Sequence, residues 1–252
     1  MENLVKQKIA AGKPTYGAIV TAASTPMVQV MAAAGLDWVM LDLEHGVIDA
    51  AAVHAMIAAT GGTRCAPLAR VPHDRHDVAQ VVLDAGAYGL VFPMVCSRAE
   101  AEQAVATLRY PPHGQRGWGP FYAAARWGLA SPDYFKVAND TLLTVVLIEH
   151  LDGVRNLDAI LTVKGIDVVV IAPGDLSVNL GYPNQRAHPE VLKVAAEIEA
   201  KVLKSGIALG GIALTPGEAA DKAARGYRMI FIGADVSLMQ RAIAASLDGT
   251  AR

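Results

Sequence analysis

Short apolar stretches alternate along this chain with longer segments in which apolar positions recur at helical spacing. The short stretches are apolar on both faces, as in parallel strands that helices cover on each side. We expect eight strands: Tyr16–Thr21, Trp38–Leu43, Ala66–Val71, Gly89–Val95, Leu142–Glu149, Asp167–Ala172, Ile207–Ala213 and Arg228–Ile232. The helices expected after them are Pro26–Ala34, Asp49–Thr60, Asp74–Ala85, Arg98–Leu108, Gly153–Val163, Pro189–Lys204, Pro216–Arg225 and Val236–Leu247, and Met1–Lys13 is also helix-like.

Eight strand–helix units in series predict a closed (β/α)8 barrel, also called a TIM barrel, that forms one domain over residues 1–252. Several of the predicted helices are followed by glycine, the residue that a helix C-terminus favours. The structural alternative is an open, doubly wound sheet. It is the weaker prediction, because no GxGxxG motif follows the first strand.

Composition and charge narrow the class of protein. A net charge of -2 and the absence of a long basic run argue against nucleic acid or an acidic membrane as a partner. No apolar run approaches the roughly 20 residues of a membrane span. Cys65 and Cys96 belong to no CxxC or Cys/His cluster, and the N-terminal residues lack the apolar core of a signal peptide. We therefore expect a cytoplasmic protein without disulfides.

Acidic side chains follow two consecutive predicted strands. Glu149 ends the fifth strand, and Asp175 follows the sixth in the sequence Pro-Gly-Asp. Active sites of barrels lie at the carboxyl ends of the strands, so these two carboxylates are placed to meet. Two carboxylates with open positions suit Mg²⁺ or Mn²⁺, which retain water and accept substrate oxygens. The alternative for Asp175 is a helix N-cap, and the pattern alone leaves both interpretations open.

Charged residues also end the second and third strands. Arg70 follows a run of small apolar residues, where it either stabilises an oxygen that gains negative charge or forms a structural salt bridge with a barrel carboxylate. His45 follows Asp42 and Glu44. In a regular strand Asp42 and Glu44 point to one side and His45 to the other, unless the turn changes this alternation. A histidine oriented by a carboxylate is a workable general base, whereas a lone histidine is more often a polar loop residue.

The positions of lysine and glycine test other chemistries. No lysine falls in a predicted strand, which argues against a Schiff-base mechanism and for stabilisation of an enolate by a metal ion. The turns around Gly210-Gly211 and Gly233-Ala234-Asp235 lie where many barrels bind phosphate. Close backbone packing is the alternative there, and we favour it.

With these residues in view, the sequence resembles the HpcH/HpaI aldolase family, which includes 4-hydroxy-2-oxoheptanedioate aldolase and 2-dehydro-3-deoxyglucarate aldolase. The segments that carry the resemblance span nearly the whole chain. They are LDLEHG (41–46), ARVP (69–72), DAGAYGLVFPMV (84–95), RYPPHGQRG (109–117), IEH (148–150) and PGDLSVNLGYP (173–183). Each is weak alone, but as an ordered set they are specific.

The resemblance implies a barrel of the phosphoenolpyruvate/pyruvate-binding type that cleaves 4-hydroxy-2-oxo acids into pyruvate and an aldehyde. It implies that Glu149 and Asp175 bind a divalent cation (Mg²⁺, Mn²⁺ or Co²⁺), and that Arg70 contacts the keto oxygen and stabilises the enolate. It further implies that His45, with Asp42 nearby, transfers the proton through water, and that the backbone at Gly174 and Asp175 receives the substrate carboxylate. Relatives assemble as hexamers, trimers of dimers with exchanged C-terminal helices, so a homo-oligomer is expected.

The chain departs from the family pattern at Leu147, Trp118, His150 and Gly174, which leaves the aldehyde open. We expect a class II pyruvate aldolase. The alternatives are another lyase that forms a pyruvate enolate (decarboxylating or cleaving CoA esters), a phosphosugar isomerase, and a barrel that only binds its ligand.

One segment, Tyr110–Ser131, interrupts the alternation with glycine, proline and aromatic residues. Irregular segments of this length are usually functional or disordered. Because it stands between the fourth and fifth strands, we predict that it opens onto the catalytic face. Arg116 and Trp118 would then help form the wall that meets the aldehyde, possibly in a neighbouring subunit, while packing at a subunit interface is the alternative.

Overall fold

The computed structural model describes residues 2–73 and 75–249. Some predictions extend beyond the described residues. The predicted N-terminal helix includes Met1, the helix predicted after the third strand includes Asp74, and the predicted domain includes residues 250–252. The strands are β1 (Thr15–Val20), β2 (Trp38–Asp42), β3 (Ala66–Arg70), β4 (Gly89–Phe92), β5 (Leu143–Ile148), β6 (Val168–Ile171), β7 (Ala208–Ile212) and β8 (Tyr227–Ala234). The helices are α1 (Leu4–Ala10), α2 (Thr25–Ala33), α3 (Ala50–Ala58), α4 (His76–Asp84), α5 (Arg98–Leu108), α6 (Phe121–Arg126), α7 (Ser131–Thr141), α8 (Leu151–Arg155), α9 (Leu157–Ile160), α10 (Pro173–Asn179), α11 (Pro189–Ser205), α12 (Pro216–Ala224) and α13 (Asp235–Leu247).

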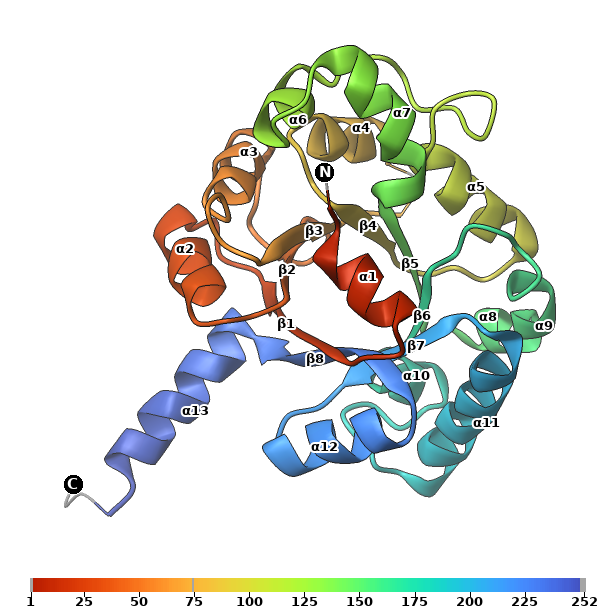
Figure 1. Ribbon diagram of the computed structural model, residues 1–252. Helices are drawn as coiled ribbons and strands as arrows, with labels where there is room; N and C mark the ends of the chain where they lie inside the picture. The colour runs from red at the N-terminus through yellow and green to blue at the C-terminus, as the bar shows by residue number, and fades with distance from the viewer. Residues whose placement is uncertain (1, 74, 250–252) are drawn as a thin grey trace.

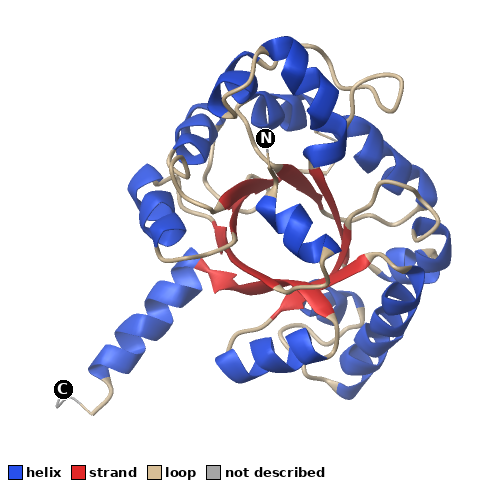
Figure 2. Cartoon of the chain, in the orientation of Figure 1, coloured by secondary structure: helices blue, strands red, loops and turns tan. Residues whose placement is uncertain are grey.

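The eight parallel strands close into a barrel in which β1 pairs with both β2 and β8, as the ring of strands in Figure 2 shows. The predicted (β/α)8 fold is therefore confirmed. Large apolar side chains fill the interior of the barrel, where Trp38 meets Phe231 edge to face at 4.5 Å. Helices cover the outside of the strands, which explains why the strands are apolar on both faces. Among the described residues, no helix is both long and apolar enough to cross a membrane.

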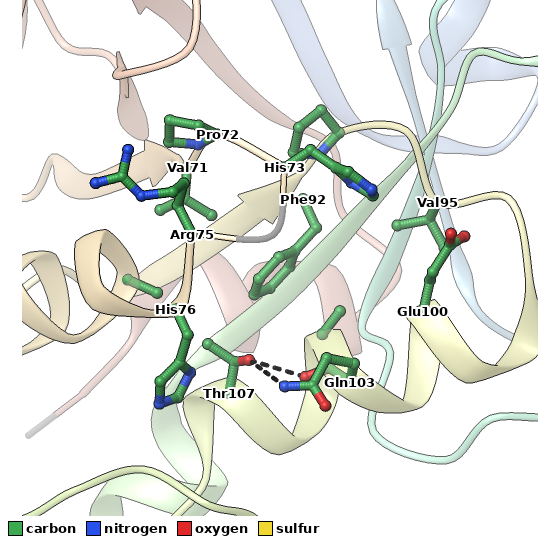
Figure 3. A pocket seen from close by; sticks show the side chains of 13 residues that line it. Val71, Pro72, His73, Arg75, His76, Phe92, Val95, Glu100, Gln103 and Thr107 are labelled. Carbon is green, nitrogen blue, oxygen red and sulfur yellow. Dashed lines mark hydrogen bonds between the residues drawn. The ribbon is translucent and has the colours of Figure 1, made fainter.

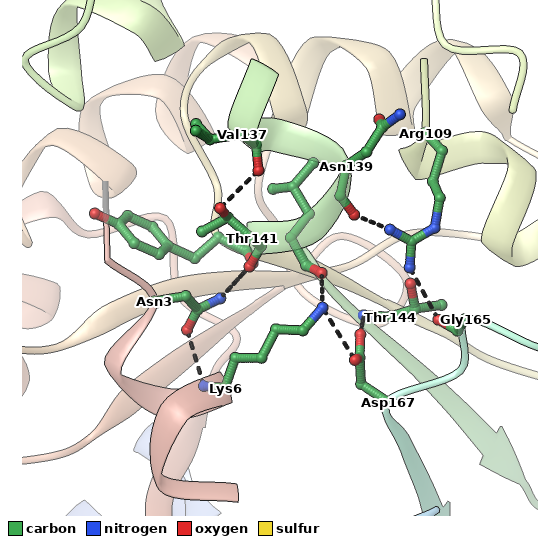
Figure 4. A network of polar contacts seen from close by, with 11 residues as sticks. Asn3, Lys6, Arg109, Val137, Asn139, Thr141, Thr144, Gly165 and Asp167 are labelled. Carbon is green, nitrogen blue, oxygen red and sulfur yellow. Dashed lines mark hydrogen bonds and ion pairs between the residues drawn. The ribbon is translucent and has the colours of Figure 1, made fainter. Parts of the chain in front are cut away.

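Helix α1 lies across the amino-terminal end of the barrel (Figure 1). Asn3 donates hydrogen bonds to the backbone oxygens of Tyr88 and Thr141 at 3.1 and 2.9 Å. The ammonium of Lys6 lies 3.1 Å from a carboxylate oxygen of Asp167 (Figure 4). These contacts close the amino-terminal end, so the carboxyl-terminal ends of the strands remain as the face for a site.

Three local predictions were wrong. The fourth strand ends at Phe92 and not at Val95, because Pro93 cannot donate to the ladder and Met94 has a left-handed φ of 53°. The predicted helix Gly153–Val163 is two short helices, α8 and α9. Helices α6, α7 and α10 were not predicted, because a proline just before α6 and in the first turn of α7 and α10 gives a turn-like pattern.

The segment Tyr110–Ser131 does not open onto the catalytic face from the end of a strand, as the sequence argument supposed. It follows α5, which has already returned the chain to the amino-terminal side of the barrel. There Trp127 donates a hydrogen bond to the oxygen of Gly86 and packs against Tyr88, just before β4. The segment also contains α6, which together with α7 lies on the outer side of α4 (Figure 1).

Arg116 and Trp118 of this segment have different surroundings. The side chain of Arg116 is fully buried, pairs with Asp84 at 2.7 Å and donates to the hydroxyl of Tyr134 at 2.9 Å. Arg116 therefore has a structural role within this subunit, and the prediction that it meets the aldehyde was wrong. Trp118 is 64% exposed and contacts Phe121 edge to face at 4.9 Å.

Candidate active site

Glu149 stands directly after β5 at the carboxyl end of the barrel and is 4% exposed. One of its carboxylate oxygens accepts a hydrogen bond from the backbone N–H of Met94 at 2.6 Å. Burial raises the pKa of Glu149 to about 7; the Met94 N–H opposes this rise, and repulsion from Asp175 and Glu44 adds to it. The charge of Arg70 also opposes the rise, and a metal ion bound at this carboxylate would favour its ionised form further.

Asp175 lies in the first turn of α10, which begins where β6 ends. The N-cap residue of this helix is Ala172, and no side chain caps the helix. The alternative role of Asp175 as an N-cap is therefore wrong. Asn179 links the two acidic segments, because its amide donates to the backbone oxygens of Glu149 at 3.4 Å and Asp175 at 3.0 Å. Neither Asn179 nor Met94 carried a signal in the sequence that pointed to this site.

Asp42 and Arg70 are register partners at the carboxyl ends of β2 and β3, so their side chains lie next to each other. The guanidinium donates from Nε to one Asp42 oxygen at 2.9 Å and from Nη2 to the other at 2.6 Å. Burial by itself would raise the pKa of Asp42, but the hydrogen bonds and charge of Arg70 hold it below the ordinary value. Nη1 of Arg70 has no acceptor among the described residues, which leaves donors for another molecule.

Glu44 and His45 occupy the turn that follows β2. The backbone N–H groups of both residues donate to Asp42, at 3.1 and 3.2 Å. The side chain of Glu44 instead approaches Arg70, with Oε2 at 3.2 Å from Nε. The side chain of His45 is 68% exposed, and its Nε2 lies 3.8 Å from Glu44 Oε2. The turn thus places a carboxylate beside the imidazole, but it is Glu44 and not Asp42.

The strands and the turn after β8 test two alternatives, a Schiff-base mechanism and a phosphosugar isomerase. None of the eight described strands contains a lysine, as expected. Gly210 lies inside β7, where an added Cβ would sit 2.7 Å from Val170, so close packing explains this glycine. The buried carboxylate of Asp235 accepts hydrogen bonds from the backbone of Thr21 and Ala22. A carboxylate at this turn disfavours a phosphate, which counts against the phosphosugar isomerase.

A separate cavity of about 220 Å³ lies between α4 and α5 (Figure 3). Phe92 stands in its middle, and one side is formed by Val71, Pro72, His73, Arg75 and His76. Its lining contains neither Arg70 nor Glu149, although it borders the segments that follow both β3 and β4. This cavity therefore lies next to the charged cluster formed by Asp42, Glu44, Arg70, Glu149 and Asp175, and it is not part of that cluster.

The charged cluster suits a divalent cation. Asp42, Glu44, Glu149 and Asp175 supply four carboxylates, and the guanidinium of Arg70 pairs with the first two. The mutual repulsion that acts on Glu149 shows that Asp175 and Glu44 are within electrostatic range of it. Among the described residues, no group of three or more His, Cys, Asp or Glu side chains is arranged to hold a metal ion. Glu149 and Asp175 supply two carboxylates, and a cation with two protein ligands would keep positions for water and substrate, as Mg²⁺ commonly does.

The fold and these side chains define a (β/α)8-barrel protein with a carboxylate-rich site at the carboxyl ends of its strands. The family model of the HpcH/HpaI aldolase/citrate lyase family matches residues 16–242. The 2-keto-3-deoxy-L-rhamnonate aldolase of Salmonella gallinarum (strain 287/91 / NCTC 13346) is 34% identical over 248 residues, which cover 98% of this chain and 92% of that enzyme. This chain belongs to the HpcH/HpaI aldolase/citrate lyase family, as the sequence motifs predicted, and it is a carbon–carbon lyase.

Solved structures agree with this assignment. An HpcH/HpaI aldolase/citrate lyase family protein from Burkholderia cenocepacia J2315 superposes with a TM-score of 0.89 at 30% identity, and the match covers 97% of this chain and 98% of that one. Citrate synthase SbnG superposes with a TM-score of 0.87 at 29% identity, with 96% and 95% covered. Similar barrels thus carry names of different carbon–carbon bond reactions, so the substrate of this chain has to be argued from its site.

Proposed function

We propose that this protein is a class II aldolase that cleaves 4-hydroxy-2-oxo acids to pyruvate and an aldehyde, or joins the two. The observation that supports this proposal most is that the buried carboxylate of Glu149 lies within electrostatic range of both Asp175 and Arg70. Glu149 and Asp175 would hold Mg²⁺, Mn²⁺ or Co²⁺. Such an ion acts as a Lewis acid that polarises the 2-oxo group.

The side chains of the site have separate roles in this proposal. Arg70 donates hydrogen bonds to the 2-oxo oxygen as that oxygen gains negative charge. His45 exchanges the proton through water. Asp42 holds Arg70 in place by two hydrogen bonds. The first turn of α10 leaves backbone N–H groups without helical acceptors, and those of Gly174 and Asp175 would bind the substrate carboxylate.

The test is removal and replacement of the metal. Protein treated with EDTA should lose cleavage of a panel of 4-hydroxy-2-oxo acids, and Mg²⁺, Mn²⁺ or Co²⁺ should restore it. Full activity in the chelated protein would refute the class II mechanism. Product analysis with oxaloacetate and CoA esters in the same panel separates the second candidate, a related pyruvate-enolate lyase. The similarity to a citrate synthase keeps that candidate in the test.

We further propose that the protein works as a homo-oligomer, a hexamer built as a trimer of dimers. Helix α13 points away from its own barrel (Figure 1) and exposes Val236, Met239 and Ile243, each at least half exposed, at helical spacing. Trp118 and Phe121 form a second exposed apolar surface. Because the glycines on either side of Trp118 lie beside Gln80 and Asp84 of α4, outside the barrel, Trp118 would contact substrate only in the site of a neighbouring subunit. Light scattering on the purified protein measures the assembly, and a monomer would contradict this proposal.

We also propose that the protein is cytoplasmic. Cys65 and Cys96 are both free thiols in the structure. Free thiols fit the reducing cytoplasm that the sequence suggested.

A further inference from the structure

Met94, in the loop between β4 and α5, has an unusual backbone conformation. Its φ is 53°, in the left-handed region, and among the described residues other than glycine only Asn184 also has a positive φ. Asparagine tolerates this region because its short polar side chain can hydrogen-bond locally, whereas methionine has no such group. Contacts made by the rest of the loop must therefore hold Met94 in this conformation.

The backbone N–H of Met94 faces the active site. It donates to Oε1 of Glu149 at 2.6 Å, a short distance of the kind that a hydrogen bond to an ionised carboxylate gives. Among the described residues, this N–H is the one hydrogen-bond donor to the Glu149 carboxylate. Glu149 is 4% exposed, so few other partners can take the place of this donor. One carboxylate oxygen is thereby tied to the loop, and Oε2 accepts no hydrogen bond from the described part of the chain.

The loop is held in place by α8, the helix that follows β5. Gly153 of α8 lies so close to Val95 that an added Cβ would sit 2.7 Å from the backbone oxygen of Val95. Asn156, at the C-terminal end of α8, donates from its side-chain amide to the backbone oxygen of Cys96 at 2.8 Å. The two residues that follow Met94 are thus anchored on α8. This anchoring explains why Met94 keeps its left-handed conformation instead of relaxing to an ordinary one.

We propose that Met94 is a positioning residue whose left-handed backbone holds the Glu149 carboxylate for the cation. Its N–H restrains Oε1, which limits rotation of the carboxylate and leaves Oε2 for the metal ion. Carboxylates that bind metals are commonly oriented by such hydrogen bonds, and loss of the partner weakens metal binding. The backbone of Met94 has this role, and its side chain is not required. The inference rests on the proposed function in one respect, the assignment of a metal to Glu149.

The first test varies the backbone preference at position 94 and measures Mn²⁺ affinity without substrate. Met94→Gly should bind Mn²⁺ within about threefold of the wild type, because glycine adopts a positive φ without steric cost. Met94→Val should bind it about 10- to 100-fold more weakly, because a β-branched residue strongly disfavours this region. Cys96→Val is the matched control, since it puts the same side chain in the same loop where φ is not positive and where the N–H donates to Glu100. This control should leave the Mn²⁺ affinity unchanged.

The second test removes the hydrogen bond and keeps the side chain. Incorporation of the α-hydroxy analogue of methionine at position 94 replaces the N–H by an ester oxygen, which cannot donate. The Mn²⁺ affinity should again fall by about 10- to 100-fold, and urea unfolding in EDTA should show that the ester protein still folds. Equal Mn²⁺ affinities of the ester protein and the wild type would overturn the proposal, and so would equal affinities of Met94→Gly and Met94→Val.

A wild type that binds no Mn²⁺ would instead refute the proposed function. The role of Met94 would then be decided by NMR of the protein in EDTA at pH 8, where Glu149 is ionised. The amide proton of Met94 should resonate downfield, as in a short hydrogen bond to a charged acceptor, and Glu149→Ala should move it upfield. An amide resonance that Glu149→Ala leaves in place would overturn the proposal.

Discussion

Replacement of Glu149 by glutamine tests the electrostatics of the site without any substrate. The pKa of Glu149 is raised from 4.5 to about 7, chiefly by burial. The folded state therefore holds this proton more tightly than the unfolded state does. The stability that this provides is fully present below pH 4.5 and is lost as the pH rises through about 7. The metal-free wild type should thus lose stability over this range relative to Glu149→Gln, which cannot ionise.

The size of the effect follows from the two pKa values. The difference between 4.5 and about 7 corresponds to about 3 kcal/mol at full ionisation. Part of this is already lost at pH 5, so the change between pH 5 and pH 8 should be about 2.5 kcal/mol. Glutamine retains an oxygen for the N–H of Met94, so the hydrogen bond at 2.6 Å has a substitute acceptor.

The assay is urea unfolding in EDTA at several pH values between 5 and 8, with wild type and variant in parallel. The free energy of unfolding of the variant should gain on that of the wild type as the pH rises. Saturating Mg²⁺ should stabilise the wild type at pH 8 and have little effect on the variant. Glu102→Gln, at an exposed position, should show no such trend. A difference between wild type and Glu149→Gln that is constant with pH, or that reverses, would refute the reasoning.

Three further predictions concern Arg70, Arg116 and Trp118. Arg70→Ala should lower pyruvate proton exchange by about 100-fold or more, as for a lost oxyanion donor, and Arg70→Lys should rescue it poorly because lysine lacks the planar fork; unchanged exchange in both would remove Arg70 from the mechanism. Arg116→Ala should cost about 3 kcal/mol of unfolding free energy, because it leaves Asp84 without its buried partner, against less than about 1 kcal/mol for the exposed Arg98→Ala; equal losses would contradict this. Trp118→Ala should change KM for the aldehyde and leave pyruvate exchange nearly intact, whereas dissociation with unaltered aldehyde preference would make Trp118 an interface residue only.

The sequence by itself determined the order of the strands and the candidate acidic residues at their ends. Buried parallel strands must be apolar on both faces, so a charged residue directly after such a strand stands out in the pattern. Glu149 and Arg70 are visible for this reason. The glycines after helices are visible because a helix C-terminus needs left-handed backbone, as at Gly206 with φ 81°. These signals depend only on residues that are close together in the sequence, so they can be recognised without the structure.

Only the tertiary structure decided which of these groups face one another. Strand alternation would put Asp42 and Glu44 on one side and His45 on the other, but the turn after β2 brings both carboxylates to Arg70 and leaves the His45 ring 3.8 Å from Glu44. Burial of Arg116 depends on Asp84 and Tyr134, which are distant in sequence. The face reached by Tyr110–Ser131 depends on the return of the chain through α5. Such contacts depend on how helices and strands pack against one another, and local patterns of residue types do not reveal them.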